Sequence, residues 1–263
     1  MRSLCSPTVI AAPSTSARRD ARARFLPPRA PFIPPPIVDP SAVISELATA
    51  ILKTPLVLKS HRGVRCEVDA PMETALSGGV RSVRITGRRW ASPRNLTCDG
   101  IEFVVGACRI DLSAALAMRG IVLERPATGT ARLSFDSSDF GNFLTHPLTR
   151  EAARGRFAFD NTDARVVDSD HLELTATWLE DENAKSPQRF ALRPGSTVGS
   201  VDVDADGVVD SASSRAMKRF FETLVVDLEG TELRYKSMRI DGETVEFELD
   251  LTVNRFPSPN VRF

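Results

Sequence analysis

Five arginines crowd a short stretch of the chain around Trp90, and their chemistry is the most specific that the sequence offers. A guanidinium group presents a planar fork of N–H donors that matches a phosphate group in a bidentate contact. The cluster therefore indicates contact with an anionic group such as a lipid headgroup, and the alternative is a solvated charged face. Its members are Arg81, Arg84, Arg88, Arg89 and Arg94.

An acidic segment at 202–207, with the sequence DVDADG, matches the first half of a calcium-binding loop. The twelfth position of such a loop would be Ser213, where glutamate is needed, and a β-type pattern precedes the segment in place of a helix. We therefore interpret it as an acidic strand end followed by a turn at Asp206 and Gly207.

Motifs of the common catalytic and metal-binding classes are missing from the sequence: it contains no HExxH, GxSxG, P-loop or GxGxxG pattern. The three histidines are isolated, and three cysteines lie among strand residues without CxxC spacing, which is typical of small buried hydrophobes. A redox pair between Cys98 and Cys108 is the alternative. We predict no catalytic residue, no metal and no cofactor. The residues concerned are His61, His146, His171, Cys66, Cys98 and Cys108.

Charge is distributed unevenly along the 263 residues, although the whole chain has a formal net charge of zero. Six of its 34 basic residues and two of its 34 acidic residues fall within the first 39, so the remainder has a net charge of minus four. An acidic body argues against nucleic-acid binding. With 42% hydrophobic residues the chain can form a core, and no apolar run reaches the length of a membrane-spanning helix.

The amino-terminal segment 1–38 has the composition of an organelle transit peptide followed by a proline-rich spacer. Arginine, serine and alanine dominate it, acids are nearly absent, and Pro7 and Pro13 interrupt its one apolar stretch. Its Ser, Thr and Pro content favours the chloroplast, with the mitochondrion as the alternative destination and a merely disordered tail as the plainest reading. We expect a single domain over 39–256 and a flexible tail over 257–263.

Apolar residues with a period of two predict that most of this domain is antiparallel β-sheet with one wet face. The best example is 244–253, which follows a turn signal at Asp241 and Gly242. A helix is expected from Ser41 to about Pro55, and its Ile44, Leu47, Ala48 and Ile51 stripe should pack on the core or, alternatively, on a membrane. Two further helices are predicted, one after Ser138 that Pro147 ends and one after Ser214, with the apolar stripes Phe140, Phe143, Leu144 and Met217, Phe220, Phe221, Leu224.

The order of elements from Val64 to Leu148 resembles the LmeA-like phospholipid-binding family. The resemblance rests on a turn at Leu76, Ser77 and Gly78, a "VRITGR" strand, a strand that ends at "IDL", a segment around Pro126 and Gly129, and an "FGNFL" helix. The carboxy-terminal half, from "FALRP" to "VEFELDLTV", is similar more loosely.

The resemblance implies an α+β, mostly antiparallel β protein: an elongated β-barrel or tube with a few short helices and an apolar interior for acyl chains. Arg84, Arg88 and Arg89 are the headgroup candidates, and the helices at Phe140–Leu144 and Met217–Leu224 are candidates to cap or gate the tube. The lipid-cavity candidates are Val83, Ile85, Ile101, Phe103, Val105, Phe140, Leu144, Phe247 and Leu249.

We therefore expect a non-enzymatic protein that binds a phospholipid or glycolipid, with peripheral membrane contact and no nucleic-acid partner. Retention of the lipid and its transfer are both open at this point. Two other classes stay open. A structural or assembly factor would have a filled core and unknown protein partners, and an enzyme acting on lipid or pigment would need Asp99, His146 and His171 to meet in the fold.

Overall fold

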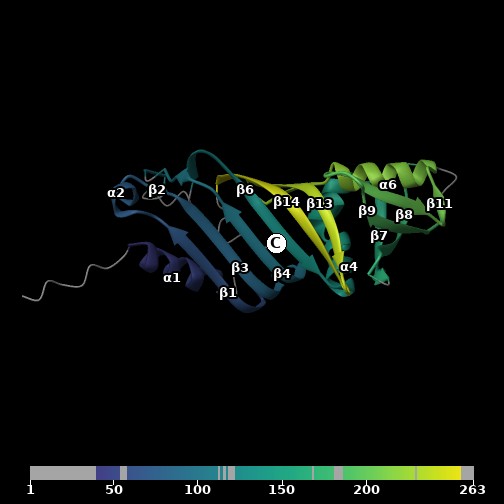
Figure 1. Ribbon diagram of the computed structural model, residues 1–263, viewed down its shortest axis with the longest axis horizontal. Helices are drawn as coiled ribbons and strands as arrows, with labels where there is room; N and C mark the ends of the chain where they lie inside the picture. The colour runs from purple at the N-terminus through teal and green to yellow at the C-terminus, as the bar shows by residue number, and fades with distance from the viewer. Residues whose placement is uncertain are drawn as a thin grey trace, which may run out of the picture. The chain divides into compact units, whose positions relative to one another are not determined.

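The computed structural model describes residues 40–53, 58–111, 113–114, 117, 122–167, 169–180, 186–228 and 230–255 (Figure 1). The predicted leader at 1–38 and the predicted tail at 257–263 lie outside these residues. No helix in the described ranges is long and apolar enough to span a bilayer. The helices are α1 (Pro40–Leu52), α2 (Met72–Ala75), α4 (Ser137–Thr145), α5 (Pro147–Ala153) and α6 (Ala212–Glu222).

Two antiparallel sheets form most of the fold, which confirms the predicted α+β, mainly antiparallel class. The larger has seven strands in the order β1-β3-β4-β6-β14-β13-β12, and the smaller has five in the order β11-β10-β9-β8-β7. The first comprises β1 (Ser60–Asp69), β3 (Ser82–Ala91), β4 (Thr97–Val105), β6 (Val122–Phe135), β14 (Thr244–Arg255), β13 (Thr231–Asp241) and β12 (Val225–Asp227). The second comprises β7 (Phe157–Val167), β8 (His171–Trp178), β9 (Gln188–Pro194), β10 (Val201–Ala205) and β11 (Val208–Val209), and β2 (Gly79–Val80) pairs separately with β5 (Cys108–Arg109).

The seven-stranded sheet has one apolar face, as the period-two pattern predicts. Val83 lies opposite Val105 and Ile85 opposite Phe103 across β3 and β4, so their side chains share this face. The other face carries ion pairs between neighbouring strands, such as Lys236 with Glu248 at 2.9 Å. At Gly129 a Cβ atom would overlap the Val104 carbonyl, so glycine is required for β6 to approach β4.

The helix α1 forms where the sequence predicts it but presents the opposite face to the protein. Three hydroxyls on one side of α1 each bind both backbone groups of one residue on the free edge of β1. Thr49 Oγ1 accepts from Cys66 N at 2.8 Å and donates to Cys66 O at 3.1 Å, and Ser45 does the same at Val68. Ser41 binds Ala70 in the same way.

The expectation that the apolar stripe of α1 packs on the core is therefore wrong for Ile44 and Leu47, while the side chain of Ile51 lies outside the described part of the chain. Ile44 and Leu47 are 40% and 63% exposed, and Ala48 is the stripe residue that packs against the core. The hydroxyl face faces the protein because the edge of β1 offers N–H and C=O groups that need partners.

The seven-stranded sheet is open, so the predicted barrel or tube is not closed. Closure would require the first strand, β1, to pair with the last, β12. The edge of β1 cannot do so because Ser41, Ser45 and Thr49 already occupy its backbone groups. The side chains of α1 thus replace the neighbouring strand that a barrel would supply.

A continuous series of aromatic rings joins the two sheets through α4 and α6. Phe247 on β14 lies 5.7 Å from Phe140 on α4 and 6.4 Å from Phe221 on α6, measured between ring centroids. Phe220 then lies 6.1 Å from Phe157 on β7 of the smaller sheet. Such ring pairs add to the stabilisation that burial alone provides.

The helix boundaries differ from the sequence expectation in two places. Asp136 caps α4, and Pro147, which was expected only to end that helix, begins α5. Proline suits a first helical position because the N–H that it lacks would have had no partner there. The cap of α6 is Ser211, whose hydroxyl accepts from Ser214 N, and not Ser214 itself.

We expect the Thr49→Val substitution to lower the free energy of unfolding by about 1–3 kcal/mol, because it leaves the Cys66 N–H and C=O on a covered edge without partners. Urea denaturation measures this change. Thr86→Val on β3 is the matched control, since no side-chain hydrogen bond of Thr86 is lost. Equal stability of the two variants would show that the hydroxyl contacts of α1 contribute nothing.

Candidate functional site

The predicted cavity residues divide into two groups in the structure. Val83, Ile85, Ile101, Phe103 and Val105 occupy adjacent positions of β3 and β4 on the apolar face, in register with one another. This group forms one continuous wall together with β14, since β6 lies between β4 and β14 in the same sheet.

The second group lies in packed core at the end of the same face. Phe140 and Leu144 on α4 are fully buried, and the Phe140 ring contacts Phe135, Phe143, Phe221 and Phe247. These two side chains line neither of the hollows described below. Their predicted role as lipid contacts stays a prediction.

An apolar crevice of about 50 Å³ lies across the apolar face beside this core. Its lining reaches from Trp90 on β3 to Val226 on β12, so both sides of the sheet curve toward it. Phe247 and Leu249 are the two predicted residues that line it. The remaining lining residues are Leu96, Thr97, Cys98, Leu133, Phe135, Phe143, Leu224, Leu228 and Leu233.

Most of these lining residues were missed at the sequence level. Leu133 and Phe135 could have been found from the sequence, because both follow the period-two alternation of β6 and so fall on the apolar face. Leu224 was expected at the end of the helical stripe that begins at Met217, whereas Leu228 follows the three-residue strand β12, which is too short to show a period. Trp90 was noticed only as the centre of the arginine cluster.

Trp90 reaches the crevice because Arg89 has a left-handed backbone, with φ of 46°. Strict alternation would place Trp90 on the face opposite Gly87 and Ile85. Arg88 and Arg89 are instead both exposed in succession, and Trp90 lines the crevice together with Cys98, its partner across the β3–β4 pair. The irregularity at Arg89 thus places two exposed cations next to an apolar opening.

The three headgroup candidates do not share one environment. Arg84 lies on the outer face of the sheet, where its Nη1 is 2.7 Å from Glu102 Oε1. Arg132 approaches the other oxygen of Glu102 at 3.6 Å, so the two arginines share one carboxylate. Arg88 and Arg89 make no ion pair with any described residue. Arg84 therefore differs from Arg88 and Arg89 in having an anionic partner and in lying farther along β3 from Trp90.

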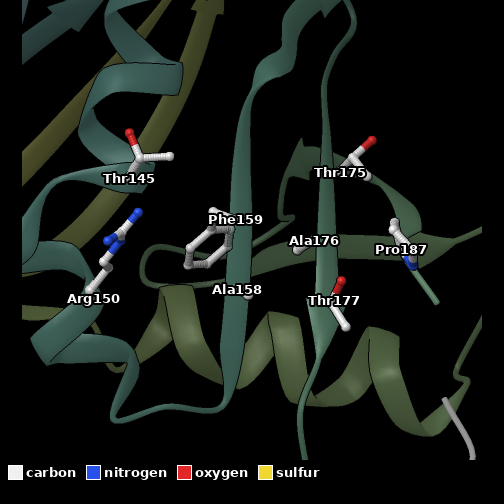
Figure 2. A pocket seen from close by; sticks show the side chains of 8 residues that line it. All are labelled: Thr145, Arg150, Ala158, Phe159, Thr175, Ala176, Thr177 and Pro187. Atoms are coloured by element: carbon white, nitrogen blue, oxygen red, sulfur yellow. The ribbon is translucent and has the colours of Figure 1, made fainter. Parts of the chain in front are cut away.

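A second hollow, with a volume of about 480 Å³, opens beside the smaller sheet (Figure 2). Figure 2 shows Arg150 of α5 on one side, Phe159 of β7 in the middle and two threonines of β8 on the other side. Hydroxyl groups and a guanidinium make this groove unsuited to acyl chains. Its lining is Thr145, Arg150, Ala158, Phe159, Thr175, Ala176, Thr177 and Pro187.

The structure does not bring together Asp99, His146 and His171, the three residues that an enzyme was expected to need. His171 lies 3.3 Å from Asp170 and 3.4 Å from Glu173, whereas His146 caps α5, where burial and the nearby Arg94 lower its pKa. Asp99 lies near Cys98 and Asp139, where its charge raises the pKa of both side chains. The three residues that an enzyme would need to bring together are thus in separate surroundings.

The interpretation of the acidic segment at 202–207 as a strand end followed by a turn is confirmed. Asp204 binds Arg193 at 3.0 Å and Asp202 lies 3.4 Å from Lys218, so both carboxylates already have cationic partners. Asp206 and Gly207, both with positive φ, form the turn between β10 and β11. No group of three or more potential metal-binding side chains occurs among the described residues.

A family model for LmeA-like phospholipid-binding proteins matches residues 43–250. The chain belongs to the LmeA-like phospholipid-binding family. The match extends from α1 to β14 and so includes both sheets and the crevice. No curated protein and no solved structure matches the chain.

We expect the thiols of Cys66 and Cys98 to resist alkylation in the native protein. Burial raises the pKa of Cys66 to about 11 and that of Cys98 to about 12, helped by the carboxylates of Glu67 and of Asp139 and Asp99 respectively. At about pH 8 almost no thiolate is then present to react. Iodoacetamide labelling with peptide mass spectrometry should find Cys108 modified first. Labelling of Cys98 at the same rate would mean that the crevice is open to solvent.

Proposed function

We propose that this protein binds a single phospholipid without catalysis, with acyl chain against the apolar face of the seven-stranded sheet. The crevice between Trp90 and Val226 carries the proposal, because its lining is almost entirely hydrocarbon and runs across six strands. Membership of a phospholipid-binding family supports it. An acyl chain needs just such a surface, since its burial is driven by removal of apolar area from water.

The phosphate of the lipid would be held by Arg88 and Arg89. Both are exposed, neither has an ion-pair partner in the described part of the chain, and Arg89 is adjacent to Trp90 of the crevice. Guanidinium groups bind phosphate in bidentate geometry, which favours a phospholipid over an uncharged glycolipid. Arg84 is excluded from this role by its contact with Glu102 on the outer face.

The crevice must widen for a lipid to enter. Its volume of about 50 Å³ is far smaller than the roughly 300–1,000 Å³ of ordinary ligand pockets. Binding therefore includes a displacement of lining side chains, and a site that opens and recloses suits transfer of lipid between membranes as well as its retention.

A structural or assembly role is the second candidate, and the same small volume favours it. The aromatic core around Phe247 shows that one end of the apolar face is filled by the protein itself. If the crevice never opens, the sheet is simply a packed scaffold. Lipid content distinguishes the two functions directly.

A plastid location is part of the proposal. It is supported by the arginine-rich, acid-poor composition of residues 1–38 and by their serine and proline content. Import of a fusion of this segment to a fluorescent protein into chloroplasts, and not into mitochondria, tests it.

We expect native mass spectrometry of the purified protein to find one phospholipid per chain, which extraction then identifies. Trp90 and Trp178 are the two tryptophans, so each can be observed alone. Phospholipids with brominated acyl chains should quench the fluorescence of the Trp178→Phe variant, which keeps the crevice residue Trp90. The Trp90→Phe variant should be quenched little. Lipid-free protein with no quenching of either variant would favour the assembly role.

Charge reversal at the different arginines should affect phospholipid loading to different extents. We expect Arg88→Glu combined with Arg89→Glu to weaken loading of phosphatidylglycerol about tenfold or more, since two charge-assisted contacts are lost. Arg84→Glu is the control, because Arg84 is already paired with Glu102 and lies farther along β3 from Trp90, so its reversal should leave loading nearly unchanged. Unchanged loading in the double variant would remove the arginines from the site.

A further inference from the structure

Exposed apolar side chains concentrate on α1 and at α2. Nine large apolar side chains are exposed among the described residues, and five of them belong to these two short segments. Ser41 of α1 binds the backbone of Ala70, two residues before α2 begins, so the segments are neighbours at one end of the larger sheet (Figure 1). We call the five side chains the α1–α2 face: Val43, Ile44, Leu47, Met72 and Leu76.

The exposure of this face is fixed by the way in which α1 is attached. Successive residues are about 100° apart around a helix, so Val43 and Leu47 lie about 160° around the axis from Ser45. Ser45 and its neighbours in the hydroxyl row are bound to β1 at both backbone groups of each partner residue. The helix therefore cannot turn its apolar side inward without breaking these hydrogen bonds.

Cations lie beyond the carboxyl end of α1. The helix runs antiparallel to β1, because Ser41 binds Ala70 whereas Thr49 binds Cys66. Continuing in that direction brings the end of α1, at Lys53, toward Arg62, which lies opposite Arg88 in the β1–β3 pair. These three cations and Arg89 are exposed and make no ion pair with a described residue.

We propose that the α1–α2 face docks on the surface of an anionic phospholipid bilayer, the aliphatic side chains entering the interface and the cations meeting the headgroups. This inference rests on the proposed lipid-binding function. It places Arg88 and Arg89 near the membrane, so a lipid would leave or enter the bilayer close to the crevice that Trp90 lines.

The size and composition of the face favour a bilayer over a protein. A stable protein interface takes about 20–30 residues a side, usually with aromatic anchors at its centre. The α1–α2 face consists of five aliphatic side chains without an aromatic ring. A few inserted aliphatic side chains plus nearby cations are enough for reversible interfacial binding. Glu46 and Glu73 lie on the same helices, so the aliphatic side chains should carry most of the affinity.

The test is sedimentation of the full chain with mixed phosphatidylcholine–phosphatidylglycerol vesicles. We expect Leu47→Ser combined with Leu76→Ser to reduce the bound fraction about tenfold, because both side chains are exposed and contribute apolar area to the interface. Val208→Ser combined with Val209→Ser is the matched control. These valines are 56% and 70% exposed, on β11 of the other sheet, and their loss should leave binding unchanged.

Lipid loading by native mass spectrometry, measured on the same variants with short-chain phospholipid, separates this inference from the proposed function. Weakened vesicle binding with intact loading supports the docking face. Unchanged vesicle binding of the Leu47 and Leu76 variant, or an equal loss in the valine control, overturns it. Vesicle binding that depends on the α1–α2 face while no variant carries lipid would overturn the proposed function and leave the docking face standing.

Discussion

An antiparallel sheet whose strands are apolar on one side is stable in water only if that side is covered. In this protein the sheet has seven strands, and the cover at one end is aromatic. Phe140 and Phe143 from α4 and Phe221 from α6 meet Phe135 and Phe247 from the sheet. The same rings connect onward to the smaller sheet, so that sheet is held by the residues that cover the first. Beside this filled end the face retains the crevice that Trp90 and Val226 line.

The backbone groups on the free edge of the sheet also need hydrogen-bond partners. The hydroxyls of α1 supply them because their spacing along the helix matches the spacing of alternate residues along β1. Hydroxyls four residues apart on a helix are separated by about 6 Å along its axis, and alternate residues of a strand by about 6.6 Å. Ser41, Ser45 and Thr49 can therefore each reach one outward-facing residue of β1. Using the polar row for this purpose leaves the aliphatic row in solvent. The exposed α1–α2 face is thus a consequence of how the edge is closed.

Sequence patterns correctly predicted the features that follow from a local repeat of apolar residues, namely the long strands and their buried side chains. Alternation located the long strands correctly, and in β14 it identified the buried residues from Val245 to Val253. The same kind of pattern failed where one side chain or one backbone angle decides which face of an element is buried. The apolar stripe of α1 pointed to core packing because nothing in the sequence shows that three hydroxyls have the spacing of a strand edge.

Closure of the sheet and the composition of the site also depend on long-range geometry. A barrel and an open sheet have the same alternation, and the difference lies in whether β1 has a free edge for β12. The positive φ of Arg89 is what brings Trp90 to the apolar face, and an arginine carries no preference for that conformation that a sequence pattern could show. The crevice residue Leu228 follows a strand too short to be recognised.

The position of the crevice indicates which side must move when a lipid enters. On one side, Trp90 belongs to β3, which is paired with β1 on one edge and β4 on the other. On the other side, Val226 belongs to β12, a three-residue strand at the edge of the sheet that pairs only with β13. Segments with few hydrogen bonds open at the lowest free-energy cost. Displacement of β12, with Leu224 and Leu228 at its ends, would widen the crevice while leaving the aromatic core and the hydroxyl contacts of α1 unchanged.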